Sequence, residues 1–308
     1  MDHHTYSIII PAYNEGARLD ATLNKVLHYV AQQKWDAEVI VVNDGSRDNT
    51  IEIVHDHMQR NSTLRLIENP GNRGKGYSVR NGMMHAGGEV LLFSDADLSS
   101  PIEEAPKLLA AIKEGADIAI GSRWMQSELQ TQRQPLYRQL FGRIFNLMLR
   151  LILGLQFKDT QCGFKAFTRP AAQAIFPQQK IERWGFDPEL LYLANKYGFK
   201  VVEVPVAWAH SAGTRISPLR DGTRMVVEML NSLECADWKI RLNSAVKFRC
   251  YEIAWTASPA IHASVEHSTL VTWKQERKPA AKRRKNAAHG VSHGDVVKKT
   301  KPRRGDRN

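Results

Sequence analysis

The sequence predicts an α/β protein with a mainly parallel sheet and helices on both faces of that sheet. Between Tyr6 and Gly121, short apolar runs alternate with stretches of helical periodicity. The apolar runs are continuous rather than interrupted at every second residue, which is typical of strands that are buried on both faces. Repeated strand-helix-strand units with right-handed crossovers build a parallel sheet.

Each expected strand is a short apolar run that ends in polar or turn-forming residues. The expected strands are Tyr6 to Pro11, Glu38 to Asn43, Leu64 to Glu68, Val90 to Asp95 and Ile118 to Gly121. The expected helices between them are Leu19 to Gln32, Thr50 to Met58, Lys75 to Ala86 and Ile102 to Glu114. Pro101 suits the start of the last helix because its fixed φ is compatible with a first turn.

The pattern changes after Ser122. We expect a long helix from about Pro135 to Leu155 and then a glycine-broken segment from Asp159 to Phe167. The elements expected further along are a helix at Pro188 to Lys196, a strand at Lys200 to Val206, a polar loop at His210 to Pro218 and a helix from about Arg220. The periodicity ends near Ala245, so the sequence predicts one domain over residues 1–240 and a tail over residues 246–308.

The charge of the chain is concentrated in the tail. The 308 residues include 43 Lys and Arg against 32 Asp and Glu, a net charge of +11, and residues 246–308 hold 15 and 5 of these. A segment this basic and poor in apolar residues is expected to be disordered. Three widely spaced cysteines argue against a disulfide scaffold, and the first residues contain no readable signal peptide. We therefore expect a cytoplasmic chain.

Asp95 and Asp97 follow a hydrophobic strand and are separated by Ala96. Two carboxylates at this spacing can share a divalent cation, and Mg²⁺ and Mn²⁺ prefer oxygen ligands. An isolated pair of this kind is more often a solvated turn. Here the preceding apolar run and the polar ends of the neighbouring strands favour a metal site.

Polar residues also follow the first and second strands, and they are candidates for binding a nucleoside. Tyr13 can stack on a base, and Asn14 or Glu15 can hydrogen-bond to a nucleoside, although a plain strand-to-helix turn is the alternative. Asp44 can accept a hydrogen bond from a base N–H, or it can belong to a helix cap. No GxGxxG motif follows the first strand, which counts against a nicotinamide-dependent enzyme.

The loop from Asn69 to Gly76 precedes an expected helix and contains Arg73, Lys75 and three glycines. Backbone N–H groups and cations at the start of a helix suit the binding of a diphosphate. The loop lacks the complete P-loop pattern, so it is weak evidence when taken alone.

Six motifs in chain order resemble the family 2 glycosyltransferases of the GT-A fold, which is a Rossmann-like α/β fold. The motifs are Tyr13-Asn14-Glu15, Asn43-Asp44-Gly45-Ser46, Asn72-Arg73-Gly74-Lys75-Gly76, Asp95-Ala96-Asp97, Gly121-Ser122-Arg123 and Asp159-Thr160-Gln161-Cys162-Gly163-Phe164-Lys165. The resemblance is strongest to the dolichyl-phosphate β-glucosyltransferases and their bacterial polyprenyl-phosphate relatives, with the dolichyl-phosphate mannose synthases next. It covers about Tyr6 to Leu233.

The resemblance implies an inverting transfer of a hexose from a nucleotide sugar to a polyprenyl or dolichyl phosphate, for glycan assembly. UDP-glucose is the preferred donor because the segment from Asp159 to Lys165 is most similar to the glucosyl branch. GDP-mannose, other UDP-sugars and a different acceptor remain alternatives. The implied cofactor is Mg²⁺ or Mn²⁺, held by Asp95 and Asp97 as a Lewis acid. A phosphate monoester is largely a dianion at neutral pH, so no strong general base is required.

The resemblance also implies roles for single residues. The nucleotide sugar is expected to contact Pro11, Tyr13, Asn14, Glu15, Asp44, Lys75, Asp95, Ala96, Asp97 and Arg215. The catalytic candidates are Asp97, Arg123, Asp159, Gln161 and Arg143. Arg123 is expected to contact phosphate, and Arg143 to contact the acceptor phosphate. Asp187 and Glu189 are rivals of Asp159 as an acidic catalytic group, but Asp187 is more simply read as the cap of the helix at Pro188.

The expected helix near residue 150 and the basic tail bear on membrane binding. Nine of the twelve residues from Ile144 to Leu155 are apolar, a run too short to span a bilayer. Such a helix is buried in the protein or lies in a membrane interface, and the mannose synthase resemblance favours the interface. The cluster Lys282 to Lys285 is expected to bind anionic lipid; nucleic-acid attraction and an atypical terminus without a role are alternatives. We expect a peripheral protein on the cytosolic face of a membrane, with no specific nucleic-acid partner.

Two other classes of protein are possible. A sugar nucleotidyltransferase shares the nucleotide-binding alternation of strands and helices, but the glycine-rich first loop of that class is missing here. A nucleic-acid or membrane-binding module driven by the tail is disfavoured by the nearly neutral body of the chain and by the Asp95 and Asp97 pair.

Overall fold

The computed structural model describes residues 4–126, 130–132, 146–148, 150, 153–209, 225 and 228. Every described element belongs to the first of two units, Met1–Cys250. The second unit, Tyr251–Asn308, lies outside the described residues. The expected domain boundary near residue 240 and the expected disorder of the tail therefore stay predictions.

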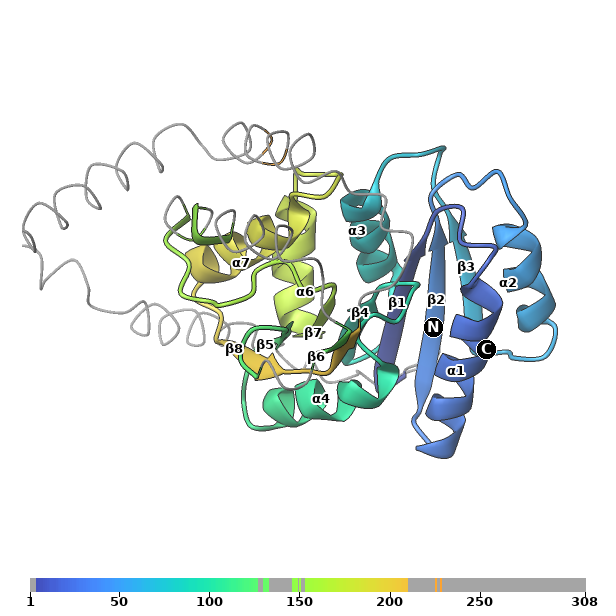
Figure 1. Cartoon of the computed structure of the whole chain (residues 1–308), viewed down its shortest axis with the longest axis horizontal. Helices are drawn as coiled ribbons and strands as arrows, with labels where there is room; N and C mark the ends of the chain where they lie inside the picture. Colours follow the sequence, from blue (N-terminus) through green and yellow to red (C-terminus); the bar gives the residue numbers. More distant parts are fainter. Residues whose placement is uncertain are drawn as a thin grey trace, which may run out of the picture. The chain divides into compact units, whose positions relative to one another are not determined.

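Seven strands in the described part of the chain form one sheet, in the order β3-β2-β1-β4-β7-β5-β8 (Figure 1). They are β1 (Tyr6–Ala12), β2 (Ala37–Asn43), β3 (Leu64–Glu68), β4 (Val90–Ser94), β5 (Ile118–Ser122), β7 (Phe164–Thr168) and β8 (Val201–Pro205). Within this sheet β7 runs antiparallel to β4 and β5, and the other neighbouring strands are parallel. Two short strands, β6 (Gln130–Gln132) and β9 (Trp208–Ala209), pair separately. The predicted mainly parallel α/β sheet is confirmed.

Helices cover both faces of the sheet and bury a separate core on each. The helical elements are α1 (Leu19–Gln32), α2 (Thr50–Met58), α3 (Lys75–His85), η1 (Ile102–Glu104), α4 (Ala105–Lys113), α6 (Arg169–Ile175), η3 (Phe176–Gln178) and α7 (Phe186–Tyr197). Side chains of α1, α2 and α4 pack in one core, and side chains of α3, α6 and α7 pack in the other. In β1, Ile8 and Ile10 join the first core and Ile9 joins the second. Successive strand residues point to opposite faces, which explains why β1 is apolar at each position from Ile8 to Ala12.

The structure differs from the sequence-based prediction mainly after β5. The segment expected to be a broken loop contains β7, followed by α6, which was not predicted. Lys165 interrupts the apolar run of β7, so the strand lacks the continuous apolar pattern of β1, β2, β4 and β5. The expected helix from Pro135 to Leu155 lies largely outside the described residues, although positions 146–148, 150 and 153 are helical. Likewise, only Met225 and Glu228 of the last expected helix are described, and both are helical.

The described helices are short compared with the roughly 20 residues that a membrane span requires. In the part of the chain that the structure describes, none is both long enough and apolar enough to cross a bilayer.

Candidate functional site

The parallel strands deliver several predicted site residues to one edge of the sheet. Asp44 follows β2, Asn69 follows β3, Asp95 follows β4 and Arg123 follows β5. The carboxyl ends of parallel strands meet at the same edge, where ligands of open α/β sheets bind. The arrangement therefore brings these residues into one candidate site.

Asp95 and Asp97 lie in the turn that follows β4, with their carboxyl groups partly open to solvent. The side chain of Asp95 is 32% exposed and that of Asp97 is 27% exposed. The Lys75 ammonium forms an ion pair with Asp95 Oδ1. Asp97 Oδ1 accepts a hydrogen bond from the Ser99 N–H at 2.9 Å, and Asp97 Oδ2 lies 3.9 Å from Arg18 Nη1. Both carboxylates can therefore still reach a ligand from the solvent side.

The donor set of this turn fits a hard divalent cation. Both side chains offer carboxylate oxygens, which Mg²⁺ and Mn²⁺ prefer. No cluster of three or more His, Cys, Asp or Glu side chains suited to a metal ion occurs among the described residues. Mg²⁺ commonly takes one or two protein carboxylates and completes its shell with water and substrate phosphates. Asp95 and Asp97 match that mode of binding, while their role as ligands stays a prediction.

The environment raises the pKa of Asp95 above its ordinary value. Burial is the largest cause, and the negative charges of Asp97 and Asp187 act in the same direction, against the attraction of Lys75. Burial alone lowers the pKa of Lys75, but Asp95 and Asp187 outweigh it and raise that pKa. Lys75 therefore carries its positive charge at neutral pH, beside the carboxylate that is expected to bind metal.

The backbone of Gly163 packs directly against the Asp95 carboxyl group. A Cβ atom at position 163 would lie 2.2 Å from Asp95 Oδ2. Real Cβ atoms do not approach an oxygen so closely, so any other residue at position 163 would force the Asp95 carboxyl group to move. This contact explains in physical terms why a glycine stands in the motif that runs from Asp159 to Lys165.

Arg123 and Asp159 form a two-point ion pair. Arg123 Nε lies 2.7 Å from Asp159 Oδ2, and Arg123 Nη2 lies 2.8 Å from Asp159 Oδ1. The Arg123 backbone N–H donates to the same carboxylate at 3.0 Å, and the Asp159 N–H donates to Glu203 at 2.8 Å. Asp159 is buried, and burial alone raises its pKa. The positive charge of Arg123 and the hydrogen bonds that Asp159 accepts from Arg123 and Gln161 outweigh burial and lower that pKa below its ordinary value. Asp159 is thus held as a carboxylate.

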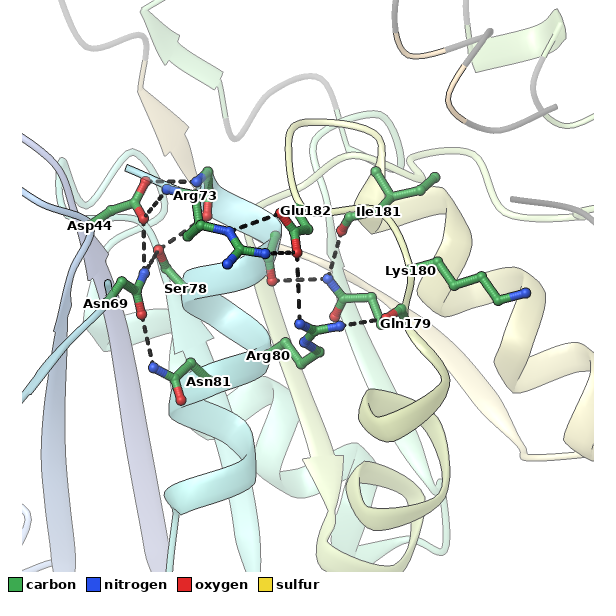
Figure 2. A network of polar contacts seen from close by, with 12 residues as sticks. Asp44, Asn69, Arg73, Ser78, Arg80, Asn81, Gln179, Lys180, Ile181 and Glu182 are labelled. Atoms are coloured by element: carbon green, nitrogen blue, oxygen red, sulfur yellow. Dashed lines mark hydrogen bonds and ion pairs between the residues drawn. The ribbon is translucent and has the colours of Figure 1, made fainter. Parts of the chain in front are cut away.

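Asp44 organises the loop between β3 and α3. Its Oδ1 accepts from Asn69 Nδ2 at 2.8 Å and from the Arg73 N–H at 2.9 Å, and its Oδ2 accepts from the Gly74 N–H at 2.8 Å. Arg73 in turn pairs with Glu182 at 2.6 Å, so the network joins the end of β2 to the segment before α7 (Figure 2). Asp44 therefore shapes the predicted diphosphate loop, and its expected contact with a base stays a prediction.

The loop after β1 is hydrogen-bonded to the loop after β2. The Asn14 N–H donates to Ser46 Oγ at 2.9 Å, and Asn14 Oδ1 accepts from the Arg47 N–H at 2.7 Å. Glu15 pairs with Arg18 at 2.7 Å. Pro11 is half-buried at the end of β1, where it pairs with Val42, and Tyr13 is half-buried beyond it. These contacts place the predicted nucleoside-binding residues at the same edge as Asp44.

The remaining predicted site residues divide into described and undescribed positions. The Ala96 carbonyl accepts from Thr22 Oγ1 at 2.6 Å, and the Gln161 N–H donates to Asp159 Oδ1 at 3.2 Å. Arg143 and Arg215 lie outside the described residues, so their expected roles stay predictions.

The expected capping role of Asp187 is wrong. Helix α7 begins at Phe186 with Gly185 at its N-cap, so Asp187 already lies inside the first turn. Its carboxylate forms an ion pair with Lys165. Glu189 accepts hydrogen bonds from the N–H groups of Lys180 and Ile181, both at 2.9 Å. The two rival acidic residues therefore both bind groups of the protein.

Sequence reasoning missed two residues near the site. The ring centroid of Trp184 lies 5.6 Å from Lys75 Nζ, and the Trp184 side chain is exposed at the surface. Lys165 is completely buried in β7, opposite Phe93 of β4. A lysine inside a run that is otherwise apolar was the available signal for Lys165, because a buried charge needs partners.

Comparison with known proteins identifies the family. The family model described as "Glycosyl transferase family 2" matches residues 7–176, more than half of the chain. This chain belongs to glycosyl transferase family 2. The match contains Asp44, Asp95, Arg123 and Asp159, so these site residues of the glycosyltransferase lie inside the family region.

Three curated relatives of this glycosyltransferase share a functional name. A dolichyl-phosphate beta-glucosyltransferase of Trichomonas vaginalis is 39% identical over 213 residues, covering 66% of this chain and 63% of that protein. Proteins of the same name from Drosophila melanogaster and Homo sapiens are 37% and 33% identical. These two matches cover 69% and 73% of this chain, and the same shares of the relatives. The match to the Trichomonas protein thus spans slightly less than two thirds of its length.

Solved structures support the fold of this glycosyltransferase. Glucosyl-3-phosphoglycerate synthase from Mycobacterium tuberculosis, in complex with Mn²⁺, UDP and glucosyl-3-phosphoglycerate, superposes with a TM-score of 0.56 at 20% identity. The superposition covers 74% of this chain and 80% of that chain. The predicted GT-A fold is confirmed by this likeness together with the seven-stranded sheet.

Replacing Gly163 with alanine tests the contact with Asp95. We expect Gly163→Ala to weaken Mn²⁺ binding by about tenfold or more, because the new methyl group displaces the Asp95 carboxylate and second-layer changes commonly have this effect. Mn²⁺ titration followed by electron paramagnetic resonance measures the change. Gly185→Ala is the matched control, since the nearest atom to its new Cβ lies at 3.4 Å. Equal Mn²⁺ affinity in the two variants would contradict the prediction.

Proposed function

We propose that this family 2 glycosyltransferase transfers glucose from UDP-glucose to dolichyl phosphate or another polyprenyl phosphate, with inversion at the sugar carbon. The observation that carries the proposal is the sequence identity of 33–39% to relatives named dolichyl-phosphate beta-glucosyltransferase. UDP as the nucleotide rests on the resemblance of the segment from Asp159 to Lys165 to the glucosyl branch.

The donor side of the site is built to hold a diphosphate. Asp95 and Asp97 would hold Mg²⁺ or Mn²⁺, which supplies Lewis-acid stabilisation of the departing nucleoside diphosphate. Lys75 adds a positive charge at the first residue of α3, where the helix N-terminus also favours anions. The Asp44 network holds the Arg73-Gly74 backbone in place beside this charge. These residues bind and orient the donor before transfer.

The acceptor side needs an electrostatic partner rather than a strong base. A lipid phosphate monoester is already largely a dianion near neutral pH, so its oxygen is a ready nucleophile. Asp159 has a lowered pKa and is paired with Arg123, which makes it a poor proton acceptor. We assign Asp159 the role of orienting Arg123, and we assign Arg123 the binding of phosphate. Gln161 and Arg143 are proposed contacts of the acceptor.

The lipid acceptor places the reaction at a membrane surface. We propose that the protein binds peripherally to the cytosolic face, through the apolar segment near residue 150 and the basic residues of the tail. Leu147 is one exposed apolar side chain of that segment. The expected attraction is about 1 kcal/mol per basic residue close to an anionic surface. Co-sedimentation with anionic and neutral vesicles, with and without residues 246–308, measures this contribution.

The function is tested by supplying Mn²⁺, a short-chain polyprenyl phosphate and either UDP-glucose or GDP-mannose. We expect a lipid-phosphate hexose from UDP-glucose, detected by mass spectrometry, and its loss when EDTA removes the metal. Product from GDP-mannose alone would overturn the choice of donor. Metal-dependent binding of UDP-glucose without any lipid product would overturn the choice of acceptor.

A further inference from the structure

Lys165 is a buried cation that the proposed reaction does not use. It is the second residue of β7, opposite Phe93 of β4 and Ile120 of β5, and its side chain is fully buried. Its ammonium is 5.4 Å from the ring centroid of Phe93. Removing an ammonium from water is costly unless it is paired and hydrogen-bonded. The groups that bind the Lys165 ammonium therefore indicate the role of its charge.

Lys165 links the backbone just before β7 to helix α7. Its ammonium donates to the Cys162 carbonyl at 2.5 Å and forms an ion pair with Asp187, in the first turn of α7. Asp187 is also nearly fully buried. The hydrogen bond holds the backbone of Cys162 and Gly163, the Cys162-Gly163 turn, and the ion pair links Lys165 to α7.

The Cys162-Gly163 turn contacts the carboxylate of Asp95, which is expected to bind metal. Gly163 follows Cys162 and packs against both oxygens of Asp95, since a Cβ at this position would lie 2.2 and 2.6 Å from them. A shift of the Cys162-Gly163 backbone would therefore change the room available to Asp95. The charge of Lys165 also balances Asp187, whose negative charge acts on Asp95 and on Lys75.

We propose that Lys165 is a positioning residue, which holds the Cys162-Gly163 turn against Asp95 and thereby sets the geometry of the metal-binding carboxylate. The proposal rests on the proposed function, because it requires Asp95 to be a metal ligand. Because Lys165 is fully buried, we assign it no contact with the substrates. Its effect reaches the reaction through the position of one carboxylate.

The test measures Mn²⁺ binding by electron paramagnetic resonance, without donor or acceptor, in Lys165→Met and in the Lys165→Met/Asp187→Asn double variant. We expect the single variant to bind Mn²⁺ about 10–100-fold more weakly. The double variant removes the unpaired buried carboxylate and should recover much of the stability in urea unfolding. Its Mn²⁺ affinity should stay low, because nothing then holds the Cys162 carbonyl.

Glu38→Gln is the matched control for loss of stability. Glu38 is buried and paired with Arg65 and Ser7 at the opposite end of β1 and β2, so this variant should lose stability and keep its Mn²⁺ affinity. Wild-type Mn²⁺ affinity in the double variant would overturn the positioning role while leaving the proposed function intact. A wild-type protein that binds UDP-glucose but no Mn²⁺ would overturn the metal site and the positioning role together.

Discussion

Asp97→Ala is expected to abolish glucosyl transfer, lowering kcat/KM by on the order of 10³-fold. The substitution removes one of the two carboxylates that we propose as ligands of the divalent cation, and loss of a single electrostatic stabiliser of the departing group commonly has this magnitude. The fold should tolerate it, because Asp97 is partly exposed and its carboxylate accepts a local hydrogen bond from Ser99. We therefore expect a large loss of activity with a small loss of stability, about 1 kcal/mol.

The measurement is product formation from UDP-glucose and polyprenyl phosphate, followed by mass spectrometry over a range of Mn²⁺ concentrations. Asp20→Asn is the control, since Asp20 is an exposed carboxylate of α1 that pairs with His57. It should leave the rate unchanged. Transfer at the wild-type rate by Asp97→Ala, at any Mn²⁺ concentration, would show that the site has been assigned wrongly.

The first part of the fold could be predicted because each buried strand repeats one pattern. β1, β2, β4 and β5 each contain three or more apolar residues in succession, since both faces of the sheet are covered. β7 escapes this rule because Lys165, its second residue, breaks the apolar run, and the charge of Lys165 is compensated by Asp187, 22 residues further along the chain. Nothing in the local sequence reveals such a partner. The antiparallel insertion of β7 between β4 and β5 therefore could not be predicted.

The candidate site could be predicted in its position but not in its contacts. Strand ends of a parallel sheet meet at one edge, so Asp44 and Asp95 could be assigned to the same region from their order alone. The partner of each residue depends on loops that fold back from distant segments. Asp44 binds the Arg73-Gly74 backbone, and Asp187 binds Lys165 rather than capping its helix. The types of side chain indicate which chemistry is possible at the site, and the tertiary fold determines which groups come into contact.

Arg123→Met is expected to destabilise the protein by about 3–5 kcal/mol at neutral pH, because it leaves the buried carboxylate of Asp159 without its cation. Asp159 is 1% exposed, and both of its oxygens are bound by the Arg123 guanidinium. The Arg123→Met/Asp159→Asn double variant removes the uncompensated charge and should recover part of this loss. Urea unfolding of the two variants measures the difference. Arg73→Met is the control, since it breaks the exposed pair with Glu182 and should cost much less.

The pH dependence gives this prediction a second readout with a definite sign. In the wild-type protein the pKa of Asp159 is below its ordinary value of 3.8, so its stabilising contribution is present above that value and is lost as the pH falls through the native pKa. In Arg123→Met, burial without the guanidinium raises the pKa of Asp159 instead. The carboxyl group of the variant then takes up a proton on folding. The difference in unfolding free energy between the variant and the wild type should therefore shrink as the pH falls from neutral to about pH 5. A deficit that stays constant over this range would mean that the lost free energy comes from packing of the arginine side chain and not from the stranded charge of Asp159.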